Sequence, residues 1–170
     1  MPDKGPIVDF SLYDLDSPIE TIEDIRKHNP QRYEMEQLTA IVYNSAETMS
    51  AVGYKDITED EFWVRGHMPE FALMPGVVMC EAAAQMACYF GKTLGYVDGL
   101  IAFAALDGVR FRGIVRPGDR FVIQIRQKKL RKKLMTAEFE CYVGENLVCD
   151  GTLKGFAIPS DQLQDAAKAD

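Results

Sequence analysis

Residues 66–81 contain three groups that together could remove water from a hydroxyl compound. His67 stands in the run Gly-His-Met-Pro, Gly76 follows a proline, and Glu81 comes fourteen positions after the histidine. A neutral imidazole can take up a proton at neutral pH, and a carboxylic acid can donate one. Unpaired backbone amides can polarise a carbonyl oxygen. Elimination of a β-hydroxyl group from a thioester requires this set of groups.

Glu81 and Gln85 are the only strongly polar side chains in the body of a predicted helix. Residues 74–91 read MPGVVMCEAAAQMACYFG, with apolar side chains on every side of the helix axis. Such a pattern is typical of a helix inside a protein. A carboxylate buried there without a partner would lose its hydration at a high cost in free energy. Because Glu81 and Gln85 are four residues apart, they share one face, and the amide can orient the carboxyl group.

The helix is predicted to start at Pro75-Gly76. The first helical amides, those of Gly76 and Val77, then lack intrahelical acceptors and point beyond the end of the helix. Gly76 has no side chain, so a ligand carbonyl could come close to its N–H, and the pattern predicts an oxyanion hole. Two structural alternatives stay open: His67 as a buried histidine satisfied by the backbone, and Glu81 as a capping or ion-pairing residue.

The elements before this helix are predicted from turn residues and apolar spacing. Residues 1–21 carry acids and prolines with little periodicity, and we expect them to form an arm over the domain. A short amphipathic helix, capped by Ser17, should stop near Asn29-Pro30. Residues 38–43 and 49–57 are extended candidates separated by Asn-Ser-Ala-Glu, which indicates a hairpin.

The segment after the helix is predicted to be entirely extended. Residues 100–111 form an apolar run broken at Asp107-Gly108, a signal for a β-bulge. Further strands are expected at 121–126, 134–143 and 147–158, with turns at 116–119 and 144–146. Residues 159–170 should be a mobile C-terminal tail. A helix that is apolar all round must be wrapped by the sheet, so we predict an α+β hot-dog fold over residues 22–158.

The bulk composition indicates an ordinary globular protein. The chain has 170 residues, of which 47% are hydrophobic and 26% charged, and this length suits one domain. No apolar run approaches the ~20 residues that span a bilayer. The N-terminus lacks the regions of a signal peptide. We therefore expect a cytoplasmic protein.

Neither a metal nor another cofactor is expected. The chain has only two histidines, and its His, Cys and carboxylate residues show no spacing typical of metal ligands. Its four cysteines include no Cys-x-x-Cys pair, and two of them lie in the apolar helix, so reduced thiols are expected. The cysteines are Cys80, Cys88, Cys141 and Cys149.

Positive charge is concentrated in one segment. The net charge is −7, but residues 110–133 contain ten basic residues and one acid, so this segment carries +9 and the rest of the chain −16. The run KKLRKK (128–133) could be a solvated hairpin turn. The alternative is a docking surface for an acidic partner or a phosphate-bearing ligand. Nucleic acid is not expected, because the chain is acidic overall and no binding motif accompanies the basic run.

Two blocks of the sequence resemble a known enzyme family. GHMPEFALMPGVVMCEAAAQ (66–85) closely resembles the signature of the 3-hydroxyacyl-[acyl-carrier-protein] dehydratases of type II fatty acid synthesis, and FAALDGVRFRGIVRPGDR (103–120) resembles a second block of that family. The chain departs from the family pattern at several positions. These are Gln31, Thr39, Met68 and Ala72.

The resemblance implies a role for each residue of the site. His67 would take the α-proton, Glu81 would protonate the leaving hydroxyl, the Gly76 amide would hold the thioester oxygen, and Gln85 would support Glu81. The reaction would convert a (3R)-3-hydroxyacyl thioester into the trans-2-enoyl thioester. A glutamate at the acid position implies the branch of the family that does not isomerise the double bond.

The resemblance also implies partners. The histidine and the glutamate facing it come from different subunits in this family, which implies an obligate homodimer and allows a trimer of dimers. Arg110, Arg112 and Arg116 would dock the acidic acyl carrier protein and its phosphopantetheine. Two other hypotheses remain: a hot-dog thioesterase, in which the carboxylate activates water, and a non-catalytic hot-dog subunit that binds acyl chains.

Overall fold

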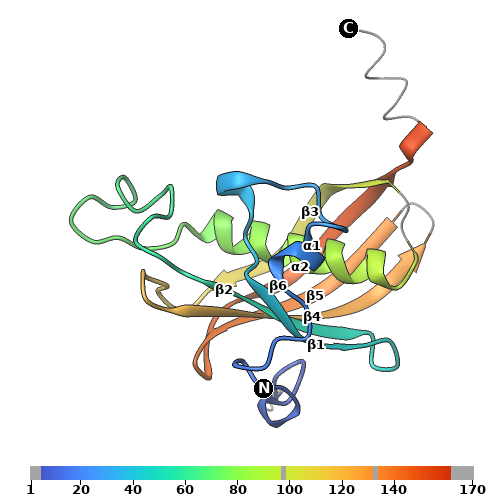
Figure 1. Ribbon diagram of the computed structural model, residues 1–170, viewed down its shortest axis with the longest axis horizontal. Coiled ribbons are helices and arrows are strands. Elements are labelled where there is room, and N and C mark those ends of the chain that lie inside the picture. The colour runs from blue at the N-terminus through green and yellow to red at the C-terminus, as the bar shows by residue number, and fades with distance from the viewer. Residues whose placement is uncertain (1–4, 97–98, 132–133, 162–170) are drawn as a thin grey trace, which may run out of the picture.

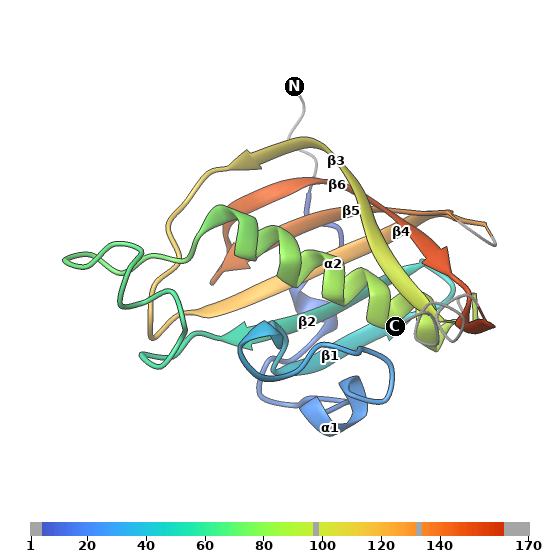
Figure 2. The same cartoon turned by 90° about the horizontal axis from the view of Figure 1, so that it is seen from above.

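A long helix lies in the hollow of a six-stranded antiparallel sheet (Figures 1 and 2). The computed structural model describes residues 5–96, 99–131 and 134–161. The helix is α2 (Gly76–Thr93), and the strand order is β1-β2-β4-β5-β6-β3. The strands are β1 (Ala40–Ser45), β2 (Ser50–Asp56), β3 (Leu100–Phe111), β4 (Arg120–Arg131), β5 (Leu134–Val143) and β6 (Asn146–Ile158), and the short turns η1 (Phe10–Leu12), α1 (Ile22–Ile25) and η2 (Tyr33–Met35) precede them. This arrangement confirms the predicted hot-dog fold.

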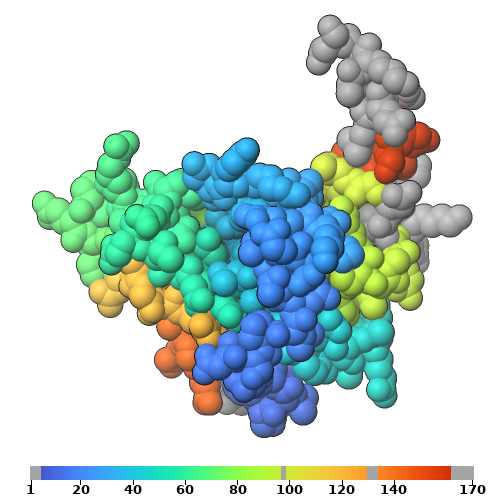
Figure 3. Space-filling model, in the orientation of Figure 1, coloured from blue at the N-terminus to red at the C-terminus, as the bar shows by residue number. Residues whose placement is uncertain are grey.

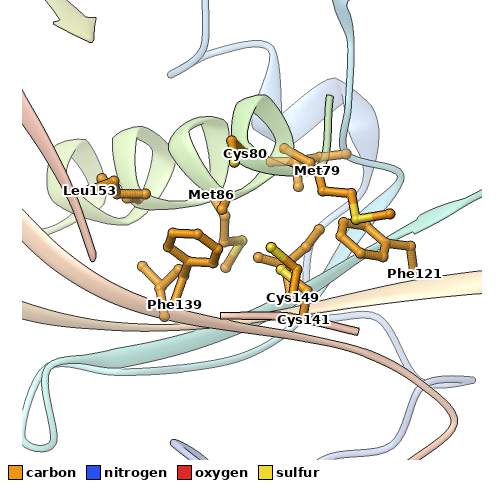
Figure 4. Packing of buried hydrophobic residues seen from close by; sticks show 14 of the residues in the cluster. Met79, Cys80, Met86, Phe121, Phe139, Cys141, Cys149 and Leu153 are labelled. Atoms are coloured by element: carbon orange, nitrogen blue, oxygen red, sulfur yellow. The ribbon is translucent and has the colours of Figure 1, made fainter. Parts of the chain in front are cut away.

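Apolar side chains on the inner face of the sheet surround α2. Side chains alternate between the two faces of a strand, and Phe121, Ile123 and Ile125 of β4 belong to the same core cluster as the buried side chains of the helix. Figure 4 shows Met79 and Met86 of α2 reaching toward Phe121 and Phe139 of the sheet. Eleven of the eighteen residues of α2 are buried. The sheet therefore encloses the helix, as its apolar sequence predicts.

The outer face of the sheet is covered by the N-terminal arm, residues 5–21. The residues of β2 and β4 that point outward include Val52 and Val122, and they form a second apolar cluster with the arm. Gln124, also on this face, is fully buried. Its side chain accepts a hydrogen bond from the Val8 N–H (2.8 Å) and donates one to the Val8 carbonyl (2.9 Å). The arm is thus held by both apolar contact and paired hydrogen bonds.

The two edges of the sheet differ. At the first edge, a β-bridge between Glu20 and Ile41 places the end of the arm beside β1. At the other edge lies the twelve-residue strand β3, and no strand of the described residues pairs with its outer side. Three large apolar side chains on β3 are exposed: Phe103 (44%), Leu106 (42%) and Phe111 (53%).

The predicted cap of the first helix is wrong. Ser17 does not cap a helix, and its hydroxyl instead donates to Asp14 (2.8 Å). α1 begins after Thr21, which forms a capping box with Asp24, and the helix covers only Ile22–Ile25. Both Ser17 and Thr21 suit a helix cap by residue type, and each has an acid three residues later, Glu20 and Asp24. Glu20 instead forms a β-bridge with Ile41, so the box is completed only at Thr21.

The six predicted strands are present, but β1 is shifted by two residues from the predicted 38–43, and β4 is longer than predicted. β3 and β5 have the expected bounds, and β3 has the expected bulge near Asp107 and a second one near Phe103. β4 continues to Arg131, so much of the run at 128–133 is strand rather than turn; residues 132–133 lie outside the described residues, as does the tail from 162 to 170. In the described part of the chain, no helix is long and apolar enough to cross a membrane.

Candidate active site

His67 lies in the loop between β2 and α2, which projects beyond the N-terminal end of the helix (Figures 1 and 3). Its N–H donates to the Trp63 carbonyl (2.7 Å), and its carbonyl accepts from the Leu73 N–H (2.9 Å). The ring atom Nδ1 lies 2.8 Å from the Leu73 carbonyl oxygen. A carbonyl can only accept, so Nδ1 carries the hydrogen and Nε2 keeps its lone pair. In the neutral ring, Nε2 is thus the nitrogen that can accept a hydrogen bond or a proton.

The segment that follows β3 holds this loop in place. The Met74 N–H donates to the Val115 carbonyl (2.8 Å). The guanidinium carbon of Arg116 lies 4.8 Å from the centre of the Phe71 ring, within the range of a cation–π interaction. The position of His67 therefore depends on the chain just beyond the end of β3.

Glu81 is oriented by Gln85, as the spacing predicts. The Gln85 Nε2 atom donates to Oε1 of Glu81 (2.8 Å) and to the Met35 carbonyl (2.7 Å), while its Oε1 accepts from the Gln37 N–H (2.9 Å). The buried amide is therefore satisfied at both ends, and reversing it would break all three bonds. Since Oε1 of Glu81 is an acceptor here, Oε2 is the atom free to carry a proton.

A cavity of about 180 Å³ opens beside Glu81. On α2 it is lined by residues at helical spacing, from Glu81 through Ala84 and Gln85 to Cys88. The opposite walls come from β3, β5 and β6 and are largely apolar, with Ile101, Phe103, Met135 and Leu153 among them. Burial raises the pKa of the Cys88 thiol to about 11, so the thiol is neutral at neutral pH. The cavity therefore combines a carboxyl group with apolar walls, and Gln31 and Lys154 add further polar groups to its lining.

The N-terminal end of α2 is as predicted, but its surroundings are not. Pro75 is the N-cap and its carbonyl accepts from the N–H groups of Val78 and Met79, which leaves the amides of Gly76 and Val77 as the first without an intrahelical acceptor. A Cβ atom on Gly76 would lie 2.7 Å from the Phe111 ring. In a single chain, the space beside Gly76, where a ligand carbonyl was predicted to bind, is therefore occupied by the Phe111 ring.

Comparison with known proteins decides the family. Residues 29–152 match the FabA-like domain. The chain is 37% identical over 136 residues to the 3-hydroxyacyl-[acyl-carrier-protein] dehydratase FabZ of Clostridioides difficile (strain 630), covering 78% of this chain and 93% of that protein. It is 36% identical over 142 residues to the FabZ of Roseiflexus sp. (strain RS-1), covering 83% of this chain and 98% of that protein. The chain belongs to the FabZ family of 3-hydroxyacyl-[acyl-carrier-protein] dehydratases.

Solved structures confirm the fold of this FabZ family member. A chain from the dehydratase heterocomplex ApeI:P of Xenorhabdus doucetiae has a TM-score of 0.67 at 17% identity, covering 84% of this chain and 96% of that one. Cj0977, a sigma28-regulated virulence protein from Campylobacter jejuni, has a TM-score of 0.57 at 14% identity, covering 84% and 95%. The arm lies outside the matched family domain, which starts at residue 29.

A single FabZ chain brings together only part of the predicted site. Glu81 and Gln85 share the cavity and a hydrogen bond. His67, Gly76 and Val77 are not among the described residues that line this cavity. Val77 is 76% exposed. The acid and its amide support thus belong to one environment, and the predicted base lies in another.

The three predicted docking arginines have different surroundings. Arg110 is exposed at the end of β3. Arg112 forms an ion pair with Asp150, and Arg116 lies over the Phe71 ring. Arg112 and Arg116 therefore have contacts within the chain, and Arg110 is the arginine most available to a partner.

Residues 26–37, which hold the Gln85 side chain, were not predicted as part of the site. Met35 and Gln37 contact it through backbone atoms, and the Asn29 side chain donates to the Gln85 carbonyl (2.9 Å). Every residue type offers a backbone carbonyl, and nearly every type a backbone N–H. The sequence therefore could not indicate that Met35 and Gln37 contact Gln85. The buried asparagine before Pro30 was a weak signal, because buried amides require partners.

Proposed function

We propose that this FabZ family member dehydrates (3R)-3-hydroxyacyl thioesters on acyl carrier protein to trans-2-enoyl thioesters in type II fatty acid synthesis, with His67 as base and Glu81 as acid. The observation that carries the proposal is the hydrogen bond from Gln85 to Glu81 beside a cavity with apolar walls on its strand side. A carboxyl group fixed at one oxygen can present the other to a hydroxyl group, and the walls beyond suit an acyl chain.

The proposed reaction uses only proton transfers. Nε2 of His67 takes the proton from C2, the electron pair forms the C2=C3 double bond, and the C3–O bond breaks as Oε2 of Glu81 protonates the leaving oxygen. Water departs, and proton transfer from the imidazolium to the carboxylate restores both groups. The amides of Gly76 and Val77 would stabilise charge on the thioester oxygen, once the Phe111 ring moves away from Gly76. The elimination is redox-neutral, so no cofactor is required.

We propose that the active unit is a homodimer paired through β3. A long unpaired edge strand with exposed apolar side chains is a template for another strand, and a two-fold axis would pair β3 with a second β3 in the antiparallel sense. The Phe111 end of one strand would then lie beside the Leu100 end of the other. Because the His67 loop is tied to Val115, just beyond Phe111, the partner's loop would approach the end of β3 that lines the Glu81 cavity.

Three further features complete the proposal. The family resemblance implies that three dimers can assemble into a hexamer, and light scattering coupled to gel filtration would distinguish two chains from six. It also implies a cytoplasmic location. The acidic carrier protein would dock on the basic segment near the end of β3, with Arg110 as the principal contact.

A single assay separates this function from its alternatives. With a crotonyl thioester, a dehydratase run in reverse adds water and yields the 3-hydroxy product, whereas a thioesterase releases free thiol. A subunit that only binds acyl chains yields neither product. His67→Ala and Glu81→Gln should each lower turnover by ~100-fold or more, because each removes a proton-transfer group. Wild-type turnover in either variant would refute the assigned role.

A further inference from the structure

A loop outside α2 fixes the side chain that orients Glu81. We call residues 26–37 the brace. The brace supplies two of the three hydrogen bonds of the Gln85 amide, from the Met35 carbonyl (2.7 Å) and the Gln37 N–H (2.9 Å). The third bond goes to Glu81. Any movement of the brace therefore changes the direction in which Gln85 presents its N–H to the acid.

Glu36 lies between these two contacts and is held by a bidentate ion pair. Its Oε1 accepts from Nε of Arg26 (2.6 Å) and its Oε2 from Nη2 (2.8 Å). The Glu36 side chain is 16% exposed and the Arg26 side chain 36%. Two parallel hydrogen bonds between a guanidinium and a carboxylate are the strong form of this ion pair. The guanidinium of Arg26 lowers the pKa of Glu36. On the other side, the Glu36 carbonyl accepts from the Lys55 ammonium group (3.1 Å), which ties the brace to β2.

The regular structure of the brace is limited to the single 3-10 turn η2 (Tyr33–Met35). Tyr33 has φ of 57°, in the left-handed region that bulky residues rarely adopt. The Arg32 guanidinium compensates by donating to three carbonyl groups of the brace, those of Arg26, Asn29 and Gln31. A segment held by side-chain ties should loosen when its strongest tie is removed.

We propose that Glu36, clamped by Arg26, is a positioning residue for catalysis, acting through Gln85 on the proton-donating carboxyl group of Glu81. The proposal rests on the role of Glu81 in the proposed function. It assigns a catalytic purpose to a carboxylate outside the substrate cavity, because Glu36 is not among the described residues that line the space beside Glu81.

Glu36→Gln should therefore affect turnover and not substrate binding. It removes the charge of the clamp and keeps the size of the side chain. A misplacement of about 1 Å in a catalytic group can cost ~100-fold in rate, so we expect kcat to fall by about tenfold or more. The brace contributes only Gln31 to the cavity lining, and the walls formed by Cys88, Met135 and Leu153 lie outside it, so KM should change much less than kcat.

Glu23→Gln is the matched control. Glu23 also contacts the Arg26 guanidinium, at Nη1, but its side chain is 72% exposed and it is not part of the brace. Its replacement removes a carboxylate from the same arginine and should leave kcat unchanged. Glu36→Gln should also have no further effect in a Gln85→Ala background, because the route to Glu81 is already broken there.

The decisive measurement joins kinetics with the side-chain amide NMR signals of Gln85. Glu36→Gln should shift or broaden these signals and lower kcat, while Glu23→Gln does neither. Equal kcat values for the two variants, or an equal loss from Glu36→Gln with and without Gln85, would overturn the positioning role. If the wild-type protein lacks dehydratase activity, the proposed function is refuted. The effect of Glu36 on Gln85 can then still be tested by NMR, and unchanged Gln85 signals in Glu36→Gln would refute it.

Discussion

Mixing two inactive variants tests whether each site is shared between subunits. His67→Ala removes the base and Glu81→Gln removes the acid, and each homodimer should retain about 1% of wild-type turnover or less. In a mixed dimer, one site would receive both defects and the other neither. Random reassociation of equal amounts makes roughly half of the dimers mixed, each with one intact site of two, so turnover should recover to roughly a quarter of wild type.

The assay is hydration of a crotonyl thioester after the two variants are co-expressed with different affinity tags. Native mass spectrometry gives the fraction of mixed dimers, and turnover should rise in proportion to it. If base and acid came from the same chain, every site in a mixed dimer would still lack one group. Turnover of the mixture would then stay near 1%, and the arrangement inferred from the unpaired edge of β3 would be refuted.

Four other outcomes are expected. Arg110→Glu should lower kcat/KM for a carrier-linked substrate and leave that for a small thioester analogue unchanged, whereas Arg112→Glu, whose arginine is already paired with Asp150, should have a smaller effect. Cys88→Phe should fill the far end of the cavity of about 180 Å³ and shift preference toward shorter chains in an assay of a ladder of 3-hydroxyacyl thioesters. Gln124→Leu should lower the free energy of unfolding in urea by about 1–3 kcal/mol, because it leaves the Val8 N–H and carbonyl without partners, and should speed proteolysis of the arm. Arg26 lowers the folded-state pKa of Glu36, so the ion pair stabilises the protein fully at pH values above the ordinary pKa of a glutamate. This stabilisation is lost as the pH falls through the lowered pKa. When the free energy of unfolding is measured against pH, Glu36→Gln should therefore lose less stability in acid than the wild type.

Local patterns were sufficient to predict α2 and most strands. The proline and glycine at 75–76 marked the start of α2, and the alternation of β5 gave its bounds at Leu134 and Val143. The hydrogen bond between Gln85 and Glu81 follows from helix geometry alone, since residues four apart share a face. Each of these features is decided by neighbours within one turn or one strand, and short-range sequence carries that information.

The place of the arm, on the outer face of the sheet, could have been predicted from the sequence of β4. Phe121, Val122 and Ile123 are consecutive apolar residues, so β4 places apolar side chains on both faces. A strand of this kind needs a second layer, because an exposed outer face would alternate with polar residues. Residues 1–21 were predicted to form an arm over the domain, but the contacts of the arm could not be predicted. Val8 and Gln124 are joined by hydrogen bonds across 116 positions of sequence, and no pattern in the arm indicates that partner.

Strand β3 links the positions of the proposed acid and base. Near Leu100 it lines the cavity that contains Glu81, and at its other end Phe111 packs on Gly76. The chain beyond Phe111 then holds the loop of His67 through Val115 and Arg116. The proposed acid is thus oriented within one chain, whereas the proposed base is positioned by the end of a strand whose outer edge pairs with no other strand of the described residues. An exposed apolar edge is normally a liability. Here, pairing that edge with its symmetry mate would cover the apolar side chains and bring the base of one chain toward the acid of the other, so the same contact would serve both stability and catalysis.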